Sequence, residues 1–235
     1  MSLAARHFAR IGAVAAVVGS ITLFVATLLH PMSADPNDPL AAFAEYAADT
    51  LWVASHLGQF LGVVLIGVAL LALGRTLTNG PRVEACVTIG AAGAIASVAT
   101  AAVLQAVDGV ALKVMVDRWA ASPAEHKDAV FWATYGVRQI EVGVASLLSL
   151  LLGLTISSYA IALLSCAAYP RWLGYVGLLG ASGLIAAGVV QAYSGFSPLA
   201  MNVSMPSSAA LLLWLTALGA VMWRRAQPRA SSASS

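Results

Sequence analysis

The sequence predicts an all-α, polytopic membrane protein with six transmembrane helices and both termini in the cytoplasm. Sixty per cent of its 235 residues are hydrophobic and only 9% are charged, whereas soluble domains carry about 25% charged residues. The mean hydropathy of +0.86 places most of this chain in lipid. The net charge of +2 comes from few, scattered basic residues, which excludes nucleic acid as an expected partner.

Six apolar stretches are each long enough to cross a bilayer, for which about 20 residues suffice. They cover 11–29, 51–73, 84–107, 137–166, 172–192 and 206–223. The first is too long for a signal-peptide core and is followed by five more, so we expect the mature protein to keep it. The stretches predict a single transmembrane domain over residues 1–223 and a disordered cytoplasmic tail over 224–235.

The basic residues predict the orientation, because cytoplasmic loops carry an excess of Lys and Arg. Eight of the 12 fall on the side that holds both termini, and Lys113, Arg118 and Lys127 fall on the other. Acidic residues show the reverse distribution, since Glu84 alone lies on the side of the termini. Three tryptophans are expected to anchor the outer interface: Trp52, Trp119 and Trp132.

Two outer segments are predicted to fold into helices. Asp38-Pro39 is typical of a helix start and predicts a short helix over 39–48. Residues 122–125 read Ser-Pro-Ala-Glu, a capping box. A helix from there to Cys166 would be about 65 Å long, roughly twice the hydrocarbon thickness. Spans three and four therefore project outward as a helical hairpin, or the second of them breaks near Gly136.

Strongly polar side chains within the spans gather at one level, near the outer face. They are His56, Gln59, Gln105, Asp108, Arg138, Glu141 and Gln191. The cytoplasmic halves offer only hydroxyls, such as that of Thr155. Because polar groups in a membrane are costly and usually face the bundle interior, this level predicts an outward-opening polar pocket among spans two to five. We expect it to bind a small or amphipathic molecule through Arg138, Gln59, Gln105 and Gln191.

Arg138 and Glu141 lie three residues apart, on one face of a helix. In one interpretation the two charges neutralise each other and hold span four against its neighbours. In the other, Arg138 receives an anionic group of the ligand, while Glu141 orients that group or accepts a proton.

His56 has three interpretations: a hydrogen-bonded structural histidine, an acid–base group, or a metal ligand. The spacing of His56 from His30 and His126 selects no metal, so neither a metal site nor a cofactor is predicted. As an alternative to a binding protein, an intramembrane enzyme acting on a lipid or isoprenoid would use Glu141, His56 and Asp108 as catalytic groups. A proton-coupled transporter and an accessory membrane subunit are further alternatives.

Two motifs link the chain to a known family. Residues 135–141 read Tyr-Gly-Val-Arg-Gln-Ile-Glu, and residues 169–174 read Tyr-Pro-Arg-Trp-Leu-Gly. With the length and the span count, they resemble the bacterial membrane-protein family catalogued as domain of unknown function 4386. The resemblance implies a multi-pass protein of the bacterial cytoplasmic membrane. It supports the importance of Arg138 and Glu141 but assigns no role to either.

Overall fold

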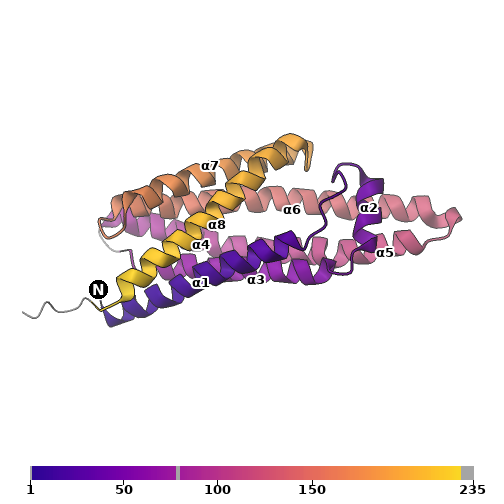
Figure 1. Ribbon diagram of the computed structural model, residues 1–235. Helices are drawn as coiled ribbons and strands as arrows, with labels where there is room; N and C mark the ends of the chain where they lie inside the picture. Colours follow the sequence, from indigo (N-terminus) through magenta and orange to yellow (C-terminus); the bar gives the residue numbers. More distant parts are fainter. Residues whose placement is uncertain (1, 78–79, 229–235) are drawn as a thin grey trace, which may run out of the picture.

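The structure is a computed structural model that describes residues 2–77 and 80–228 (Figure 1). Its segments are α1 (Leu3–Leu28), α2 (Pro39–Ala48), α3 (Trp52–Gly74), α4 (Pro81–Gln105), the π-helical η1 (Ala106–Leu112), α5 (Lys113–Ala121), α6 (Ala124–Ser165), α7 (Arg171–Ser194) and α8 (Pro198–Ala226). The described residues contain no strand, which confirms the all-α prediction.

Six helices within the described ranges are long and apolar enough to cross a membrane: α1, α3, the continuous stretch Pro81–Ala121, α6, α7 and α8. The third and fourth, at 41 and 42 residues, are longer than the predicted spans 84–107 and 137–166. α1 begins and α8 ends at the same end of the bundle, as an even number of spans requires (Figure 1). The side of the membrane that each end faces stays a prediction.

The bundle packs in two connected groups. α6 lies against α7 and α4, and α1 lies against α3 and α8. Large side chains fill the half nearer the termini, among them the buried Leu70, Leu163, Trp214 and Met222. Trp214 Nε1 donates a hydrogen bond of 2.7 Å to the carbonyl of Leu173, which satisfies the indole N–H within this core.

The predicted short helix is α2, which lies across the opposite end of the bundle (Figure 1). Asp38 Oδ1 accepts hydrogen bonds from the backbone amides of Leu40 and Ala41, as the Asp-Pro pattern predicts. Lys113 Nζ donates to the carbonyls of Tyr46 and Ala47 at 2.9 and 3.0 Å. These bonds attach the C-terminal end of α2 to α5.

α5 and the first turns of α6 form a helical hairpin that extends past α2 (Figure 1). α6 continues unbroken through Gly136, so the alternative of a break there is wrong. The predicted capping box is also wrong, because Pro123 is the N-cap residue and accepts no side-chain bond, while Ser122 Oγ donates to the Arg118 carbonyl. The proline fixes an extended backbone just before the helix and thereby replaces the serine cap.

The end of α8 differs from the predicted tail. Residues 224–226 complete α8, and the Arg225 guanidinium donates to the Ala168 carbonyl and lies 4.6 Å from the centre of the Tyr169 ring. Both contacts tie the last helical turn to the loop between α6 and α7. Residues 229–235 of the predicted tail lie outside the described residues.

Candidate functional site

The fully buried charged and histidine side chains of the described residues lie at the end of the bundle that α2 covers. Among the described residues, Lys, Arg, His, Asp and Glu side chains that are fully buried are His56, Arg138 and Glu141, with 1, 6 and 2% of their surface exposed. The other buried polar residues in the membrane-spanning helices are hydroxyls and Gln191. The predicted polar level is therefore a real feature of the packed bundle.

His56 on α3 faces Asp108 on η1. His56 Nε2 lies 3.0 Å from Asp108 Oδ2, and Trp52 Nε1 donates to the Asp108 carbonyl at 3.0 Å. A π-helical turn holds an extra residue and changes the direction of the side chains after it; such turns are frequent at functional sites. Here the π-helical segment presents both the side chain and the carbonyl of Asp108 to α3.

Gly109 makes this close approach possible. A Cβ added there would lie 2.5 Å from His56 Cβ, far inside van der Waals contact. Any side chain at 109 would push η1 away from α3 and separate Asp108 from His56.

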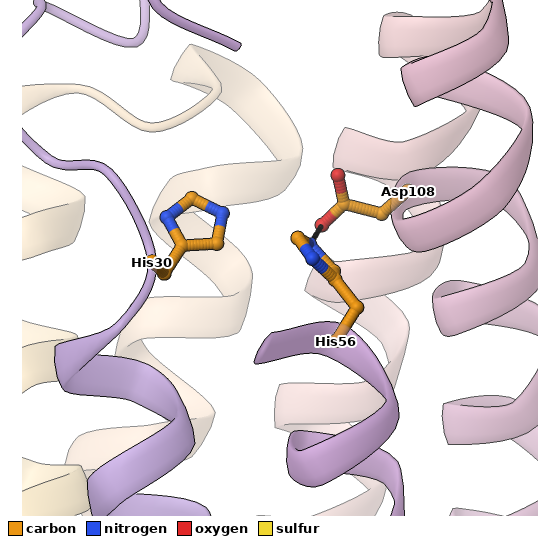
Figure 2. Close-up of side chains that lie close together, drawn as sticks. All are labelled: His30, His56 and Asp108. Carbon is orange, nitrogen blue, oxygen red and sulfur yellow. Dashed lines mark ion pairs between the residues drawn. The ribbon is translucent and has the colours of Figure 1, made fainter. Parts of the chain in front are cut away.

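His30 joins this pair from the segment between α1 and α2 (Figure 2). Its ring centre lies 5.0 Å from that of His56 and 4.8 Å from that of Trp52. One potential ligand atom from each of His30, His56 and Asp108 lies within 4.8 Å of the others. We call these three residues the His–Asp cluster.

Both imidazoles of the His–Asp cluster use Nδ1 locally. His30 Nδ1 lies 2.7 Å from the Pro31 carbonyl, and His56 Nδ1 lies 2.7 Å from the Trp52 carbonyl. A carbonyl only accepts, so each Nδ1 carries the proton, and in the neutral ring Nε2 is a lone-pair acceptor. Ser55 Oγ donates to the same Trp52 carbonyl and lies 3.3 Å from His56 Nδ1; with the proton on Nδ1, this nitrogen cannot accept the serine proton.

Arg138 and Glu141 on α6 form an ion pair, here called the Arg–Glu pair. Arg138 Nη1 lies 2.6 and 2.5 Å from the two carboxylate oxygens of Glu141. The guanidinium also lies over the rings of Tyr46 and Phe196, with centroids at 5.5 and 4.8 Å. This geometry favours the interpretation in which the two charges neutralise each other and fix α6 beneath α2.

The predicted amide residues divide between two places. Gln105 Nε2 donates to Gln59 Oε1 at 3.3 Å, which links α4 to α3 beside the His–Asp cluster. Gln191 Nε2 donates to the Val142 carbonyl at 3.4 Å and ties α7 to α6. His56 and Gln105 therefore make their polar contacts with residues on another helical segment, not with residues three or four positions away on their own helix.

Several polar atoms at this level have no hydrogen-bond partner within the described chain. They are His56 Nε2, Asp108 Oδ1 and Gln105 Oε1. Although His56 Nε2 and Asp108 Oδ2 are close, their geometry is not that of a hydrogen bond. Buried polar atoms without partners are rare in folded proteins, and each requires an explanation.

α2 and its flanks shape the electrostatics above the cluster. Burial lowers the pKa of His30 from its ordinary 6.5, and the nearby Asp108 carboxylate opposes that shift. Burial raises the pKa of Tyr46 to about 12, opposed by Arg138 and assisted by Glu141 and Asp108. Tyr46 thus interacts electrostatically with both the Arg–Glu pair and the Asp108 carboxylate.

Aromatic rings pack closely at the polar level. The Tyr46 and Trp52 ring centres are 4.4 Å apart, and those of Trp52 and His56 are 4.5 Å apart. A hollow of about 460 Å³ lies at the tip of the hairpin beside His126, and one of about 310 Å³ lies between α1 and α8 beside Phe24. Asp108 keeps 13% of its side chain exposed, so the cluster is not wholly enclosed.

Comparison with protein families, with curated proteins and with solved structures found no match to this chain.

Sequence reasoning considered His30 as a partner of His56 but predicted no site from their spacing, and it missed two other contributors. Tyr46 and Lys113 belong to segments predicted to lie outside the membrane. Trp52, predicted as an interface anchor, is fully buried instead, because α2 folds over it. The sequence did indicate that His30 and His56 could lie near each other, because His30 follows the outer end of the first span and His56 lies near the outer end of the second.

Proposed function

We propose that this integral membrane protein binds a small ligand at the His–Asp cluster, through a positively charged or hydrogen-bond-donating group of that ligand. One observation carries the proposal: the atoms without partners at this level are acceptors. They are a histidine lone pair on His56, a carboxylate oxygen on Asp108 and an amide oxygen on Gln105. A cation or a donor satisfies all three, and an anion satisfies none.

The Arg–Glu pair supports this choice of charge. Arg138 Nη1 already contacts both oxygens of Glu141, and aromatic rings lie against the guanidinium. An anionic ligand would have to displace a buried carboxylate, which leaves an uncompensated charge behind. We therefore assign the Arg–Glu pair to the scaffold and the His–Asp cluster to the ligand.

Packing limits the size of the group that enters. His30, Trp52 and His56 are in mutual ring contact, which leaves room for an ion or a small amine. An amphipathic amine fits if its head group reaches Asp108 and its tail lies along the apolar exterior. We place the site at the extracytoplasmic face of a bacterial cytoplasmic membrane, on the strength of the basic-residue distribution and the family resemblance.

The test uses two probes of matched size, propylammonium and propionate, added to the full-length protein in lipid nanodiscs. Binding to the folded state alone stabilises it by RT ln(1 + [L]/Kd), about 2.7 kcal/mol at 100 times Kd. We expect propylammonium to raise the unfolding midpoint of the wild type and of the exposed control Asp128→Asn, but not that of Asp108→Asn. A shift with propionate as large as that with propylammonium, or an unchanged response of Asp108→Asn, would overturn the proposal.

An intramembrane acid–base enzyme is the second candidate function. It is favoured by the proximity of two side chains that can act as acid or base, since His56 Nε2 and Asp108 Oδ2 lie 3.0 Å apart. Glu141 has no part in this version, because Arg138 holds its carboxylate. Turnover of a lipid or isoprenoid substrate that persists in His56→Gln and Asp108→Asn would eliminate it.

A further inference from the structure

We propose that His30, His56 and Asp108 bind a divalent first-row transition metal ion, such as Zn²⁺ or Fe²⁺, through two imidazole Nε2 atoms and one carboxylate. The inference rests on the proposed function, because it names the cation that the unpartnered acceptors receive. The ligand set comes from three separate elements: the segment after α1, helix α3 and the π-helical η1. The three side chains lie close together, as Figure 2 shows.

The tautomers point to a metal site. Histidines that bind metals through one nitrogen usually donate the other ring N–H to a carbonyl or carboxylate, which fixes the orientation of the ring. Both His30 and His56 do so, through Nδ1 to the carbonyls of Pro31 and Trp52. Their Nε2 lone pairs are thereby directed away from the backbone and remain available to an ion.

The contact between His56 and Asp108 requires a cation. With the proton on Nδ1, His56 Nε2 and Asp108 Oδ2 are two acceptors 3.0 Å apart, and they repel each other. A proton on Nε2 would relieve this repulsion, and so would a metal ion bound to both atoms. His30 distinguishes the two solutions. An ion pair between His56 and Asp108 involves only these two residues, whereas a metal ion also binds a third ligand, and a ligand atom of His30 lies within 4.8 Å.

The distances fit an ion after a small movement. Zn–N and Zn–O bonds are about 2.0–2.2 Å long, so two ligands of one tetrahedral ion lie roughly 3.4 Å apart. His56 and Asp108 are held on helices at nearly that separation. His30 lies on the connection between α1 and α2, so its ring closes the remaining gap of about 1.4 Å at most without disturbing a helix.

The chemistry of the ligand set selects the class of ion. Two imidazoles and one carboxylate suit Zn²⁺ or Fe²⁺ better than Mg²⁺ or Ca²⁺, which prefer oxygen ligands. Three protein ligands leave at least one coordination position open, which is the arrangement of catalytic rather than structural zinc sites. That position would face the partly exposed edge of Asp108, where a water molecule or an exogenous ligand reaches the ion.

The experiment measures metal binding by full-length protein in nanodiscs after removal of bound metal with a chelator. Zn²⁺ is titrated by competition with a chromophoric chelator, and Co²⁺ is added separately as a visible-absorption probe of coordination. We expect one Zn²⁺ per chain and an intense, low-symmetry Co²⁺ spectrum. His30→Ala and Asp108→Asn should weaken Zn²⁺ binding at least about 100-fold, beyond the 10- to 100-fold typical of outer-shell partners.

His126→Ala is the matched control, because His126 lies exposed on the hairpin away from the cluster. It should bind Zn²⁺ as the wild type does. His30→Ala is the decisive variant, because His30 is half-buried on a connection and its loss leaves the helices packed; its unfolding midpoint verifies this. Wild-type Zn²⁺ affinity in His30→Ala, or less than one Zn²⁺ per chain in the wild type, overturns the metal site.

The outcome separates this inference from the proposed function. Stabilisation by propylammonium without Zn²⁺ binding would refute the metal site and leave the cation site standing. Failure of both probes would refute both.

Discussion

Replacing Gly109 with alanine tests whether the close approach of η1 to α3 builds the site. The added Cβ would lie 2.5 Å from His56 Cβ and 3.0 Å from His56 Cγ. Neither atom can rotate away, because His56 Cβ is fixed to the α3 backbone and the ring is held by its bond to the Trp52 carbonyl. The two helical segments themselves must separate.

The required displacement sets the magnitude. Ordinary carbon contacts begin near 3.4 Å, so η1 must move away by roughly 1 Å. Overpacking of this kind costs about 1–3 kcal/mol. The same movement lengthens the 3.0 Å separation of His56 Nε2 and Asp108 Oδ2 and the 3.0 Å bond from Trp52 Nε1 to the Asp108 carbonyl. Stability and ligand binding should therefore fall together.

The assay is reversible unfolding in mixed detergent micelles, followed by helical circular dichroism. Gly143→Ala is the control, since a Cβ at 143 meets nothing within 4 Å and alanine favours helix over glycine by up to about 1 kcal/mol. We expect Gly109→Ala to lower the free energy of unfolding and to weaken Zn²⁺ binding, while Gly143→Ala leaves both unchanged or slightly improved. Equal unfolding free energies for the two variants would refute the steric argument.

Three further predictions concern the surroundings of the site. Arg138→Met or Glu141→Leu alone should cost about 3–5 kcal/mol of unfolding free energy, and the double variant much less, as a double-mutant cycle would measure; additive losses would contradict a self-neutralising pair. Lys113→Met removes the bonds to the last carbonyls of α2 and should speed amide hydrogen exchange in α2 but not in α3. Burial raises the pKa of Glu45, but hydrogen bonds from the amides of residues 33–34 outweigh it and hold the pKa below its usual 4.5. Protection of those amides should therefore be complete above pH 4.5 and should be lost as the pH falls through the lowered pKa of Glu45. Glu45→Gln should show no such pH dependence.

Composition and periodicity were sufficient to predict the bundle, because lipid imposes a strong constraint on the chain. A membrane requires about 20 apolar residues for each crossing and disfavours buried charge. The six spans and the common level of His56, Arg138 and Glu141 followed from these two rules. The start of α2 followed from Asp38-Pro39, because a capping carboxylate and a fixed proline φ are local properties.

The partners of the polar groups could not be predicted in the same way. His56 and Gln59 stand three residues apart in the sequence, as do Gln105 and Asp108, yet the contacts run His56 to Asp108 and Gln59 to Gln105. The π-helical turn redirects the side chains, and it has no local sequence signature comparable to a cap. A contact between helices depends on their relative rotation, which hydropathy does not determine.

His30 shows the same limit for connections. It follows the end of α1 and belongs to no periodic pattern, so the sequence gives no direction for its side chain. Its place is determined by α2, whose C-terminal carbonyls are held by Lys113 and whose Tyr46 ring lies 6.2 Å from the His30 ring, centre to centre. The packing of an outer segment such as α2 onto the bundle is a tertiary contact, and the hydropathy of the separate spans does not predict it.

The two charged groups beneath α2 differ in a way that bears on function. The Arg–Glu pair is complete in itself, because opposite charges face each other within one helix and need nothing more to remain buried. The His–Asp cluster is not complete, since its facing atoms are both acceptors and a third histidine nitrogen lies within reach. A divalent ion bound as proposed engages all three groups at once, and Zn²⁺ titration of the wild type and of His30→Ala measures whether it does so.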